Sequence, residues 1–511
     1  MKDRTSYKLA RRLTLQFPNG HILYHRIILH LFQMVFFIFE ALNSYNLKHI
    51  GQMKVIGALL FNLFISSFVF GQTKQEKGII KLLDGYISEN YSKYSPGCAV
   101  LVSKNGNIVY KKGFGKANLE FDVPVIPESV FRIGSITKQF TAVAILQLVE
   151  QHKIALNDSV QKFVKNYHSK GKKITIENLL THTSGIKPYE GIDAKVPNAI
   201  RVDFSPETLI DSLDKLPLDF VPGSKYQYCN SNYFLLGKII EEVSGQKYQT
   251  YLQEQVFSRI GLISTSYDNP DEVIKNRVSG YTAVSGEYKN AGFISMSTVY
   301  SAGALLSNVK DLYRWHQALK NGELLKNETW QKATSPFILA DGKLSEYGYG
   351  FFIKNENNVK SIGHGGAIDG FRAVEIFYPE KDLYITLLCN SEKDNFMELF
   401  AGISHIASGN EVPPRYKDIK IPEEQLDSYI GNYTFLENPQ QSIQVYKKEG
   451  RLYADLSNKS GLNMALLGQT DTLFFLPDVI RIPTTIEFIL SNGKVTGLFW
   501  TQEHKHEARK D

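Results

Sequence analysis

The sequence predicts an α/β (α+β sandwich) protein: an antiparallel sheet flanked by helices, a helical lobe, and a small C-terminal all-β domain. Two observations carry this prediction. Strand-like segments with alternating hydrophobicity lie near both ends of the first part of the chain and enclose a long stretch of helical patterns and loops. This order favours one antiparallel sheet completed by both ends. Beyond about residue 410 the chain carries short alternating segments and turns, which is typical of a barrel-like β domain.

Six elements are predicted to build the first domain, over residues 73–410. An amphipathic helix comes first, followed by two strands around Asn105-Gly106, a dipeptide typical of a hairpin turn. A long apolar helix follows the hairpin, and two further strands are separated by a Pro-Glu-Lys-Asp turn. The expected ranges are 76–91, 98–103, 107–112, 135–151, 371–378 and 383–389.

Residues 411–424 are predicted to be a linker because they are rich in proline. The β domain is expected over residues 425–511, with hairpin turns at Glu449-Gly450 and Asn492-Gly493. We interpret His504–His506, near its end, as a solvated polar tail rather than a metal site. The expected strands cover residues 429–434, 442–446, 452–456, 472–475, 485–490 and 495–500.

The composition of the chain is that of a globular protein. Its 511 residues are 43% hydrophobic and 22% charged, which excludes a disordered, a collagen-like or a disulfide-stapled protein. The formal net charge of +6 would suggest an anionic partner. Residues 1–72, however, contain eight basic and two acidic side chains, and this is the whole excess. The rest of the chain is balanced, so we expect no nucleic-acid partner.

Residues 53–71 are predicted to be a signal peptide. A lysine precedes a mostly apolar run with small residues at Val69 and Gly71, and the run is shorter than the ~20 residues that a membrane span prefers. We therefore expect a periplasmic or secreted protein, with a membrane anchor through this segment as the alternative. Residues 1–52 are interpreted as an over-extended reading frame, although the apolar stretch 27–42 could form a first membrane segment.

The three cysteines do not form a disulfide framework, because their number is odd and small. Cys98 and Cys389 lie in apolar strand-like runs, and we interpret them as small buried hydrophobic residues. Cys229 has no paired histidine nearby in the sequence that would favour a thiol nucleophile.

Ser135 and Lys138 are the first candidate catalytic pair. Their i, i+3 spacing places the hydroxyl and the amine on one helical face. A serine needs a neighbouring base to become a nucleophile, and a lysine can be that base when burial or another cation lowers its pKa. The spacing alone is weak evidence, because it recurs at several other places in the chain, among them Ser212/Lys215. Ser135 stands out because it directly precedes a long, unbroken apolar helix.

The segment FRIGSITKQFTA around Ser135 resembles the nucleophile motif of the serine β-lactamase and penicillin-binding-protein superfamily. It looks most like the branch with class C β-lactamases, D-alanyl-D-alanine carboxypeptidases, D-aminopeptidases and related esterases. Tyr228–Asn230 matches the Tyr-x-Asn motif of this branch, LLTHTSGI at 179–186 matches another of its segments, and His364–Gly366 matches its His-x-Gly motif. The resemblance covers about residues 76–400 and implies a β-lactamase/transpeptidase-like fold and a serine hydrolase.

The resemblance also implies a role for each matched residue. Ser135 would attack a carbonyl carbon and form an acyl-enzyme, and Lys138 and Tyr228 would share general acid–base work. A tyrosine has an ordinary pKa near 10, so Tyr228 needs the adjacent cation to act near neutrality. Asn230 would hold Lys138 and contact the substrate, and His364 would contact the substrate or Tyr228. The residues alone leave other interpretations open: a packing tyrosine, a turn asparagine and a loop histidine.

The strand after His364 would contribute Gly366 and Ala367 to substrate binding. The backbone N–H groups of Ser135 and Ala367 would form an oxyanion hole. His364 stands where β-lactamases have a lysine that binds the substrate carboxylate, so we do not expect potent β-lactam hydrolysis. The histidine in LLTHTSGI, His182, is interpreted as a structural residue that bonds a neighbouring backbone group.

The sequence therefore predicts an exported, monomeric serine hydrolase that needs no cofactor or metal. Its expected partner is a small-molecule or peptide substrate with an amide or ester bond, either a D-amino-acid peptide or a small acyl ester. The C-terminal β domain is expected to border the mouth of the active site. Two alternatives remain: a non-hydrolytic binder that resembles penicillin-binding proteins, and a membrane-tethered sensor.

Overall fold

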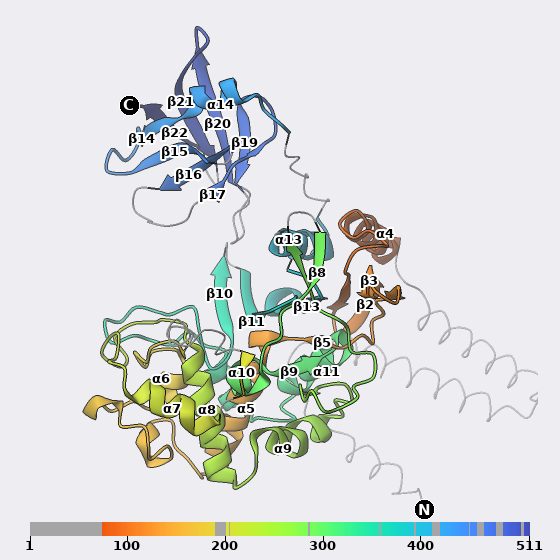
Figure 1. The fold of residues 1–511 in the computed structure, drawn as a ribbon, viewed down its shortest axis with the longest axis vertical. Helices are drawn as coiled ribbons and strands as arrows, with labels where there is room; N and C mark the ends of the chain where they lie inside the picture. The colour runs from red at the N-terminus through yellow and green to blue at the C-terminus, as the bar shows by residue number, and fades with distance from the viewer. Residues whose placement is uncertain are drawn as a thin grey trace, which may run out of the picture. The chain divides into compact units, whose positions relative to one another are not determined.

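The computed structural model describes residues 74–189, 201–203, 205–284, 287–356, 359–392, 395–410, 419–448, 450–456, 464–476, 484–501 and 505–511 (Figure 1). The predicted signal peptide, the segment before it and most of the predicted linker lie outside the described residues. Across these ranges, no helix is long and apolar enough to cross a membrane.

A six-stranded antiparallel sheet forms the centre of the first domain, in the order β10-β11-β12-β13-β1-β2. Strand β1 pairs with β13, so the first hairpin and the last strands of the domain complete one sheet, as the sequence predicted. All four predicted strands are confirmed. The strands are β1 (Cys98–Lys104), β2 (Asn107–Phe114), β10 (Phe352–Glu356), β11 (Val359–Ile368), β12 (Phe371–Tyr378) and β13 (Leu383–Cys389).

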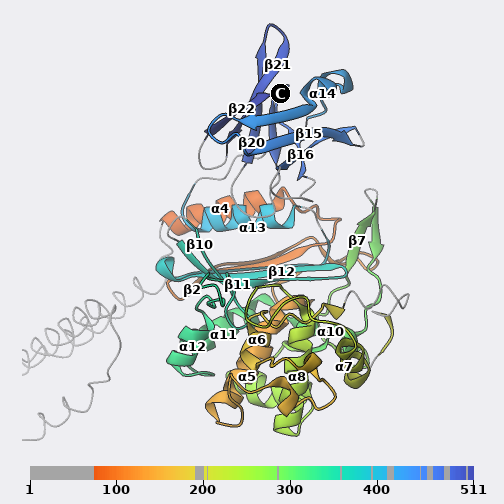
Figure 2. The same ribbon diagram turned by 90° about the vertical axis from the view of Figure 1, so that its left-hand side faces the viewer.

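Two helices from opposite ends of the domain cover one face of this sheet. Helix α4 (Lys74–Ser88) and helix α13 (Phe396–Ala407) lie side by side on it (Figure 2). Their apolar sides join the strands in one hydrophobic core that includes Cys98 and Cys389, both fully buried and neither in a disulfide. The predicted amphipathic helix and the interpretation of these two cysteines are thus confirmed.

The opposite face of the sheet carries the helical lobe (Figure 2). Helix α5 (Thr137–Glu150) is its centre, and residues 137–148 are all buried, the polar ones among them as well as the apolar ones. The other helices are α6 (Ile176–Leu180), α7 (Pro206–Asp214), α8 (Asn230–Ser244), α9 (Tyr248–Leu252), α10 (Met296–Gly303), α11 (Val309–Lys320) and α12 (Asn327–Ala333). Short strands connect them: β3 (Lys116–Asn118), β4 (Val123–Pro124), β5 (Phe131–Arg132), β6 (Ser266–Tyr267), β7 (Tyr281–Val284), β8 (Glu287–Asn290) and β9 (Leu305–Ser307).

The C-terminal domain is a nearly closed antiparallel barrel, drawn in blue in Figure 1. Its sheet has the order β17-β16-β15-β14-β22-β21-β20-β19-β18. The two edge strands, β17 and β18, are separated by Leu466 alone, so the edges of the sheet come together. The strands are β14 (Gly431–Phe435), β15 (Ser442–Lys448), β16 (Arg451–Leu456), β17 (Met464–Ala465), β18 (Leu467–Gly468), β19 (Leu473–Leu476), β20 (Thr484–Ser491), β21 (Lys494–Thr501) and β22 (Lys505–Lys510).

Two features of this domain differ from the sequence prediction. Lys505 and His506, which were interpreted as part of a solvated polar tail, begin β22, and this strand pairs with both β14 and β21 in the middle of the sheet. Ala508 is buried, whereas the charged residues beside it point outward, so a strand with one solvated face resembles a polar tail in sequence. In addition, helix α14 (Glu423–Tyr429) begins inside the stretch predicted as a linker, and its Tyr429 packs on the ring of Phe488.

Candidate active site

Ser135 lies in a short 3-10 turn, Gly134–Ile136, which leads directly into helix α5. Strand β11 packs tightly against this turn. A Cβ atom on Gly134, where φ is +49°, would lie 2.9 Å from the backbone N of Ala367, and a Cβ atom on Gly366 would lie 2.0 Å from the carbonyl oxygen of Ile133. Only glycines permit this approach, so the two glycines place the predicted residues Gly366 and Ala367 beside Ser135.

Lys138 is fully buried one helical turn after the serine. Its Nζ donates to Ser135 Oγ at 3.0 Å, to Asn230 Oδ1 at 2.6 Å and to the carbonyl oxygen of Ala302 at 2.8 Å. These three acceptors match the three N–H donors of an ammonium group. The predicted contacts of Lys138 with Ser135 and Asn230 are therefore present in the structure.

Tyr228 and Asn230 reach Lys138 from the start of helix α8. Cys229 caps this helix with extended backbone angles, φ −151° and ψ 119°. Side chains alternate along an extended segment, so Tyr228 and Asn230 point to one side and Cys229 to the other. The Tyr228 ring lies 4.9 Å from Lys138 Nζ, while Cys229 Sγ donates to the carbonyl oxygen of Ile186 at 3.2 Å. This alternation explains the Tyr-x-Asn spacing.

His364 is buried on β11, and its ring nitrogens are used within the protein. Nδ1 donates to the carbonyl oxygen of Gly365 at 2.5 Å, and Nε2 accepts from the hydroxyl of Tyr347 at 2.9 Å. Burial, together with the charge of Lys138, lowers the pKa of His364 to about 3, so the ring is neutral. The sequence suggested a contact with the substrate or Tyr228; the centroids of the His364 and Tyr228 rings are 6.1 Å apart, within the range of an aromatic pair.

Sequence reasoning missed the residues that surround this centre. Tyr233 and Tyr347 are completely buried. The ring of His182 lies 5.0 Å from that of Tyr233 and 4.7 Å from that of Tyr347. The sequence contains one indication of Tyr347, the run Tyr-Gly-Tyr-Gly at 347–350, in which a Cβ atom on Gly350 would lie 2.9 Å from the carbonyl oxygen of Lys138. His182 accepts a hydrogen bond from the backbone N–H of Cys229, so its interpretation as a structural residue is confirmed.

Comparison with known proteins agrees with this arrangement. The family model described as Beta-lactamase matches residues 83–405. The chain belongs to the Beta-lactamase family. A second model, described as a domain of unknown function (DUF3471), matches residues 416–510 of this Beta-lactamase family protein.

Similar proteins include several penicillin-binding proteins and D-aminopeptidases. Penicillin-binding protein 4* of Bacillus subtilis is 27% identical over 80% of this chain and 93% of its own length. D-aminopeptidase of Brucella canis is 26% identical over 56% of this chain and 54% of its own length. The octameric penicillin-binding protein homologue from Pyrococcus abyssi has 25% identity and a TM-score of 0.60, and the match covers 85% of this chain and 99% of that structure. The chain is accordingly a serine hydrolase of the Beta-lactamase family.

The described residues do not suggest a metal centre. No group of three or more histidine, cysteine, aspartate or glutamate side chains among them could hold an ion. The predicted absence of a cofactor is left as an expectation.

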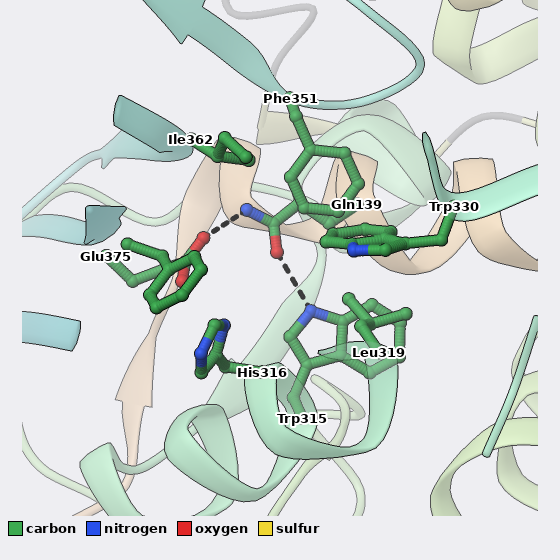
Figure 3. A pocket seen from close by; sticks show the side chains of 9 residues that line it. Gln139, Trp315, His316, Leu319, Trp330, Phe351, Ile362 and Glu375 are labelled. Carbon is green, nitrogen blue, oxygen red and sulfur yellow. Dashed lines mark hydrogen bonds between the residues drawn. The ribbon is translucent and has the colours of Figure 1, made fainter. Parts of the chain in front are cut away.

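A buried polar cluster lies behind the site, between the sheet and helix α5 (Figure 3). Gln139, the residue after Lys138, accepts a hydrogen bond from Trp315 Nε1 at 2.9 Å and donates one to the Glu375 carboxyl group on β12. Glu375 is also paired with His364 across β11 and β12. Burial raises the pKa of Glu375 to about 7, although its hydrogen bonds with Gln139 and other groups oppose the rise.

We expect the variant Glu375→Gln to gain stability relative to the wild type as the pH rises. A carboxyl group whose pKa is raised on folding, here from 4.5 to about 7, stabilises the folded state below the lower value. This contribution is lost as the pH rises through the higher value, and the difference corresponds to at most about 3 kcal/mol. Denaturant unfolding gives the free energy of unfolding of both proteins at pH 4.5 and pH 8. The value for the variant minus that for the wild type should be larger at pH 8 than at pH 4.5.

The comparison between variant and wild type isolates Glu375. His364 and His316 have lowered pKa values and act in the opposite direction, but they do so in both proteins and cancel in the difference. Glu380→Gln, an exposed glutamate in the turn after β12, serves as the matched control and should leave the pH dependence unchanged. An identical pH dependence for Glu375→Gln and the wild type would contradict the prediction.

Proposed function

We propose that this chain hydrolyses amide bonds through an acyl-enzyme on Ser135, and that its substrates are amides or short peptides of D-amino acids. The observation that carries the proposal is the 3.0 Å hydrogen bond from Lys138 Nζ to Ser135 Oγ, beside the ring of Tyr228. A serine hydroxyl needs such a charged and basic neighbourhood to become a nucleophile. The similarity to D-aminopeptidase supports the substrate class.

In the first half-reaction, Ser135 gives its proton to the phenolate of Tyr228 while Oγ bonds to the carbonyl carbon of the substrate. Lys138 donates three hydrogen bonds, as a protonated amine does, and its positive charge favours the phenolate form of the neighbouring tyrosine. The C–N bond of the tetrahedral intermediate then breaks, and Tyr228 returns the proton to the leaving amine. An acyl-enzyme and a free amine result.

The second half-reaction repeats these steps with water. Tyr228 takes a proton from the water molecule, whose oxygen bonds to the acyl carbon, and the ester bond to Ser135 Oγ breaks. The proton returns to Oγ and the carboxylic acid leaves. Asn230 keeps Lys138 in place throughout, through the 2.6 Å hydrogen bond from Nζ to Oδ1.

The proposed oxyanion hole consists of the backbone N–H groups of Ser135 and Ala367. Ala367 is exposed on β11, and the close approach at Gly134 and Gly366 brings its backbone beside the serine turn. The N-terminus of α5, which begins two residues after Ser135, adds a positive field where the negative charge develops.

The neutral state of His364 favours substrates that have no carboxylate group near this residue. The corresponding lysine of β-lactamases attracts a carboxylate as a point charge. His364 is buried, uncharged and bonded to Tyr347. An amino acid amide or anilide has no carboxylate beside its scissile bond and needs no such cation.

We also propose that the protein is exported, because residues 53–71 have the features of a signal peptide. N-terminal sequencing of the protein from a periplasmic or culture fraction should then begin near Gln72. A protein that keeps residues 53–71 in the membrane fraction would instead support the membrane-tethered alternative.

The substrate proposal is tested with enantiomeric pairs of amino acid p-nitroanilides and dipeptides. We expect kcat/KM for the D form to exceed that for the L form by at least about tenfold, the size of a discrimination worth about 1.4 kcal/mol. Labelling with a fluorophosphonate should stop this turnover. Equal rates for both enantiomers would contradict the substrate class, and stable labelling without turnover of any amide or ester would support the non-hydrolytic binder.

A further inference from the structure

His182 holds the backbone on both sides of Tyr228. Its carbonyl oxygen accepts from the N–H of Gln227 at 3.0 Å, and its ring Nδ1 accepts from the N–H of Cys229 at 3.2 Å. The His182 ring also lies 4.4 Å from the Tyr228 ring. His182 therefore accepts hydrogen bonds from the N–H groups of the residues directly before and after Tyr228, and its ring packs against the Tyr228 ring.

The hydrogen bonds assign the state of this ring. Nδ1 accepts from Cys229 and also from Asn232 Nδ2 at 3.2 Å, so it carries no proton, and the hydrogen of the neutral ring is on Nε2. Nε2 is buried without a hydrogen-bond partner, and the imidazole ring packs near the rings of Tyr228, Tyr233 and Tyr347. Burial and the nearby charge of Lys138 keep the pKa of His182 well below its ordinary value.

The backbone of His182 also has an uncommon conformation. Its φ is +57°, in the left-handed region that few residues other than glycine, asparagine, aspartate and histidine adopt readily. His182 is also fully buried in a segment, residues 181–184, in which every side chain is buried. A strained backbone conformation persists only where the surrounding structure holds it in place, and such conformations cluster at functional sites.

We propose that His182 is a positioning residue for Tyr228, which acts through its Nδ1 acceptor and its ring rather than by any proton transfer of its own. The proposal rests on the proposed function, because it gives Tyr228 the acid–base role. A misplacement of about 1 Å in a catalytic group can lower the rate about 10²-fold. The loss should appear in kcat rather than in KM, because the His182 side chain bonds to Cys229 and Asn232, beside the acid–base group Tyr228.

The experiment compares His182→Asn with His182→Gln and His182→Leu. Asparagine tolerates the positive φ and places an amide oxygen close to the position of Nδ1, whereas glutamine places its oxygen one bond further away and leucine has no acceptor. We expect the Gln and Leu variants to lose about 10²-fold in kcat with little change in KM, and the Asn variant to recover at least about tenfold of that loss. The rate at which a fluorophosphonate labels Ser135 should follow the same order.

Thr181→Val is the matched control for a general loss of packing. Thr181 is fully buried beside His182, and its side chain bonds to the carbonyl oxygen of Glu177 and to Thr183 rather than to residues 227–229. We expect the melting temperature of Thr181→Val to fall, and its kcat to change much less than that of His182→Leu. Equal activity losses in the Asn and Leu variants, or a loss in Thr181→Val as large as in His182→Leu, would overturn the proposal.

The labelling rate separates this inference from the proposed function. A wild-type protein that hydrolyses no amide or ester would refute the proposed function, yet Ser135 labelling would still report on the position of Tyr228. If labelling is equally fast in the wild type and in the Gln and Leu variants, the positioning role of His182 is wrong, whatever the substrate.

Discussion

Ser135→Ala should lower kcat for amide hydrolysis by about 10⁴ to 10⁶-fold, the range found when the nucleophile of a serine hydrolase is removed. The reason is that the variant removes the proposed nucleophile, the Ser135 hydroxyl that accepts a hydrogen bond from the buried Lys138 amine at 3.0 Å. Lys138 keeps its bonds to Asn230 and Ala302, so the fold of the site should survive. The measurement is the initial rate with a D-amino-acid p-nitroanilide, together with the loss of fluorophosphonate labelling.

Ser212→Ala is the matched control for this variant. Ser212 and Lys215 have the same i, i+3 spacing, but Ser212 lies on helix α7, where its Oγ donates to the carbonyl oxygen of Thr208 at 2.9 Å. This variant should have wild-type activity. If Ser135→Ala retained more than a few per cent of the activity, Ser135 could not be the nucleophile.

The control shows what the sequence could and could not predict about the nucleophile. Eight Ser-x-x-Lys segments occur in the chain, and periodicity alone does not distinguish them. Ser135 was distinguished by the apolar helix that follows, and the structure shows why that pattern matters: an amine buried in that helix meets the serine at 3.0 Å. Strands were predictable for a similar local reason: β13, for example, is a short, mostly apolar run that follows a turn, and all of its residues are buried.

Contacts between distant segments could not be predicted in this way. Tyr347 meets His364, and His182 meets Cys229, because the chain folds back on itself, and no periodic pattern marks the pair in either case. The same holds for the carboxyl group of Glu375, which bonds to Gln139 inside the core. A buried polar network depends on the exact positions of its partners, which composition and spacing do not contain.

The sequence also could not show which glycine of β11 lies against the serine turn. The His-x-Gly motif identified Gly366, but the adjacent Gly365 looks the same in sequence. In the structure a Cβ atom on Gly365 would be 3.8 Å from the carbonyl oxygen of Ala373, an ordinary contact, whereas a Cβ atom on Gly366 would lie 2.0 Å from that of Ile133. Neither glycine has a positive φ, so the difference between them is one of space alone.

This difference leads to the second large effect: Gly366→Ala should lower kcat by about 10² to 10³-fold, as the loss of one oxyanion-hole donor does. The added methyl group would meet the backbone of Ile133 and approach Ser135 N within 3.3 Å. Backbone atoms cannot rotate away as a flexible side chain can, so β11 must move away from the serine turn. The N–H of Ala367 would move with it, away from the position of the developing oxyanion.

Gly365→Ala is the control, since it adds the same methyl group to the exposed side of the same strand. It should keep kcat within about threefold of the wild type, because a surface substitution typically changes a free energy by no more than about 0.5 kcal/mol. Overpacking in Gly366→Ala should also cost about 1–3 kcal/mol of stability, so rates must be compared at a temperature where thermal unfolding shows both variants folded. If the two alanine variants were equally active under those conditions, the close approach of β11 to the serine turn would not be what places the Ala367 N–H, and the proposed oxyanion hole would have to be built from other donors.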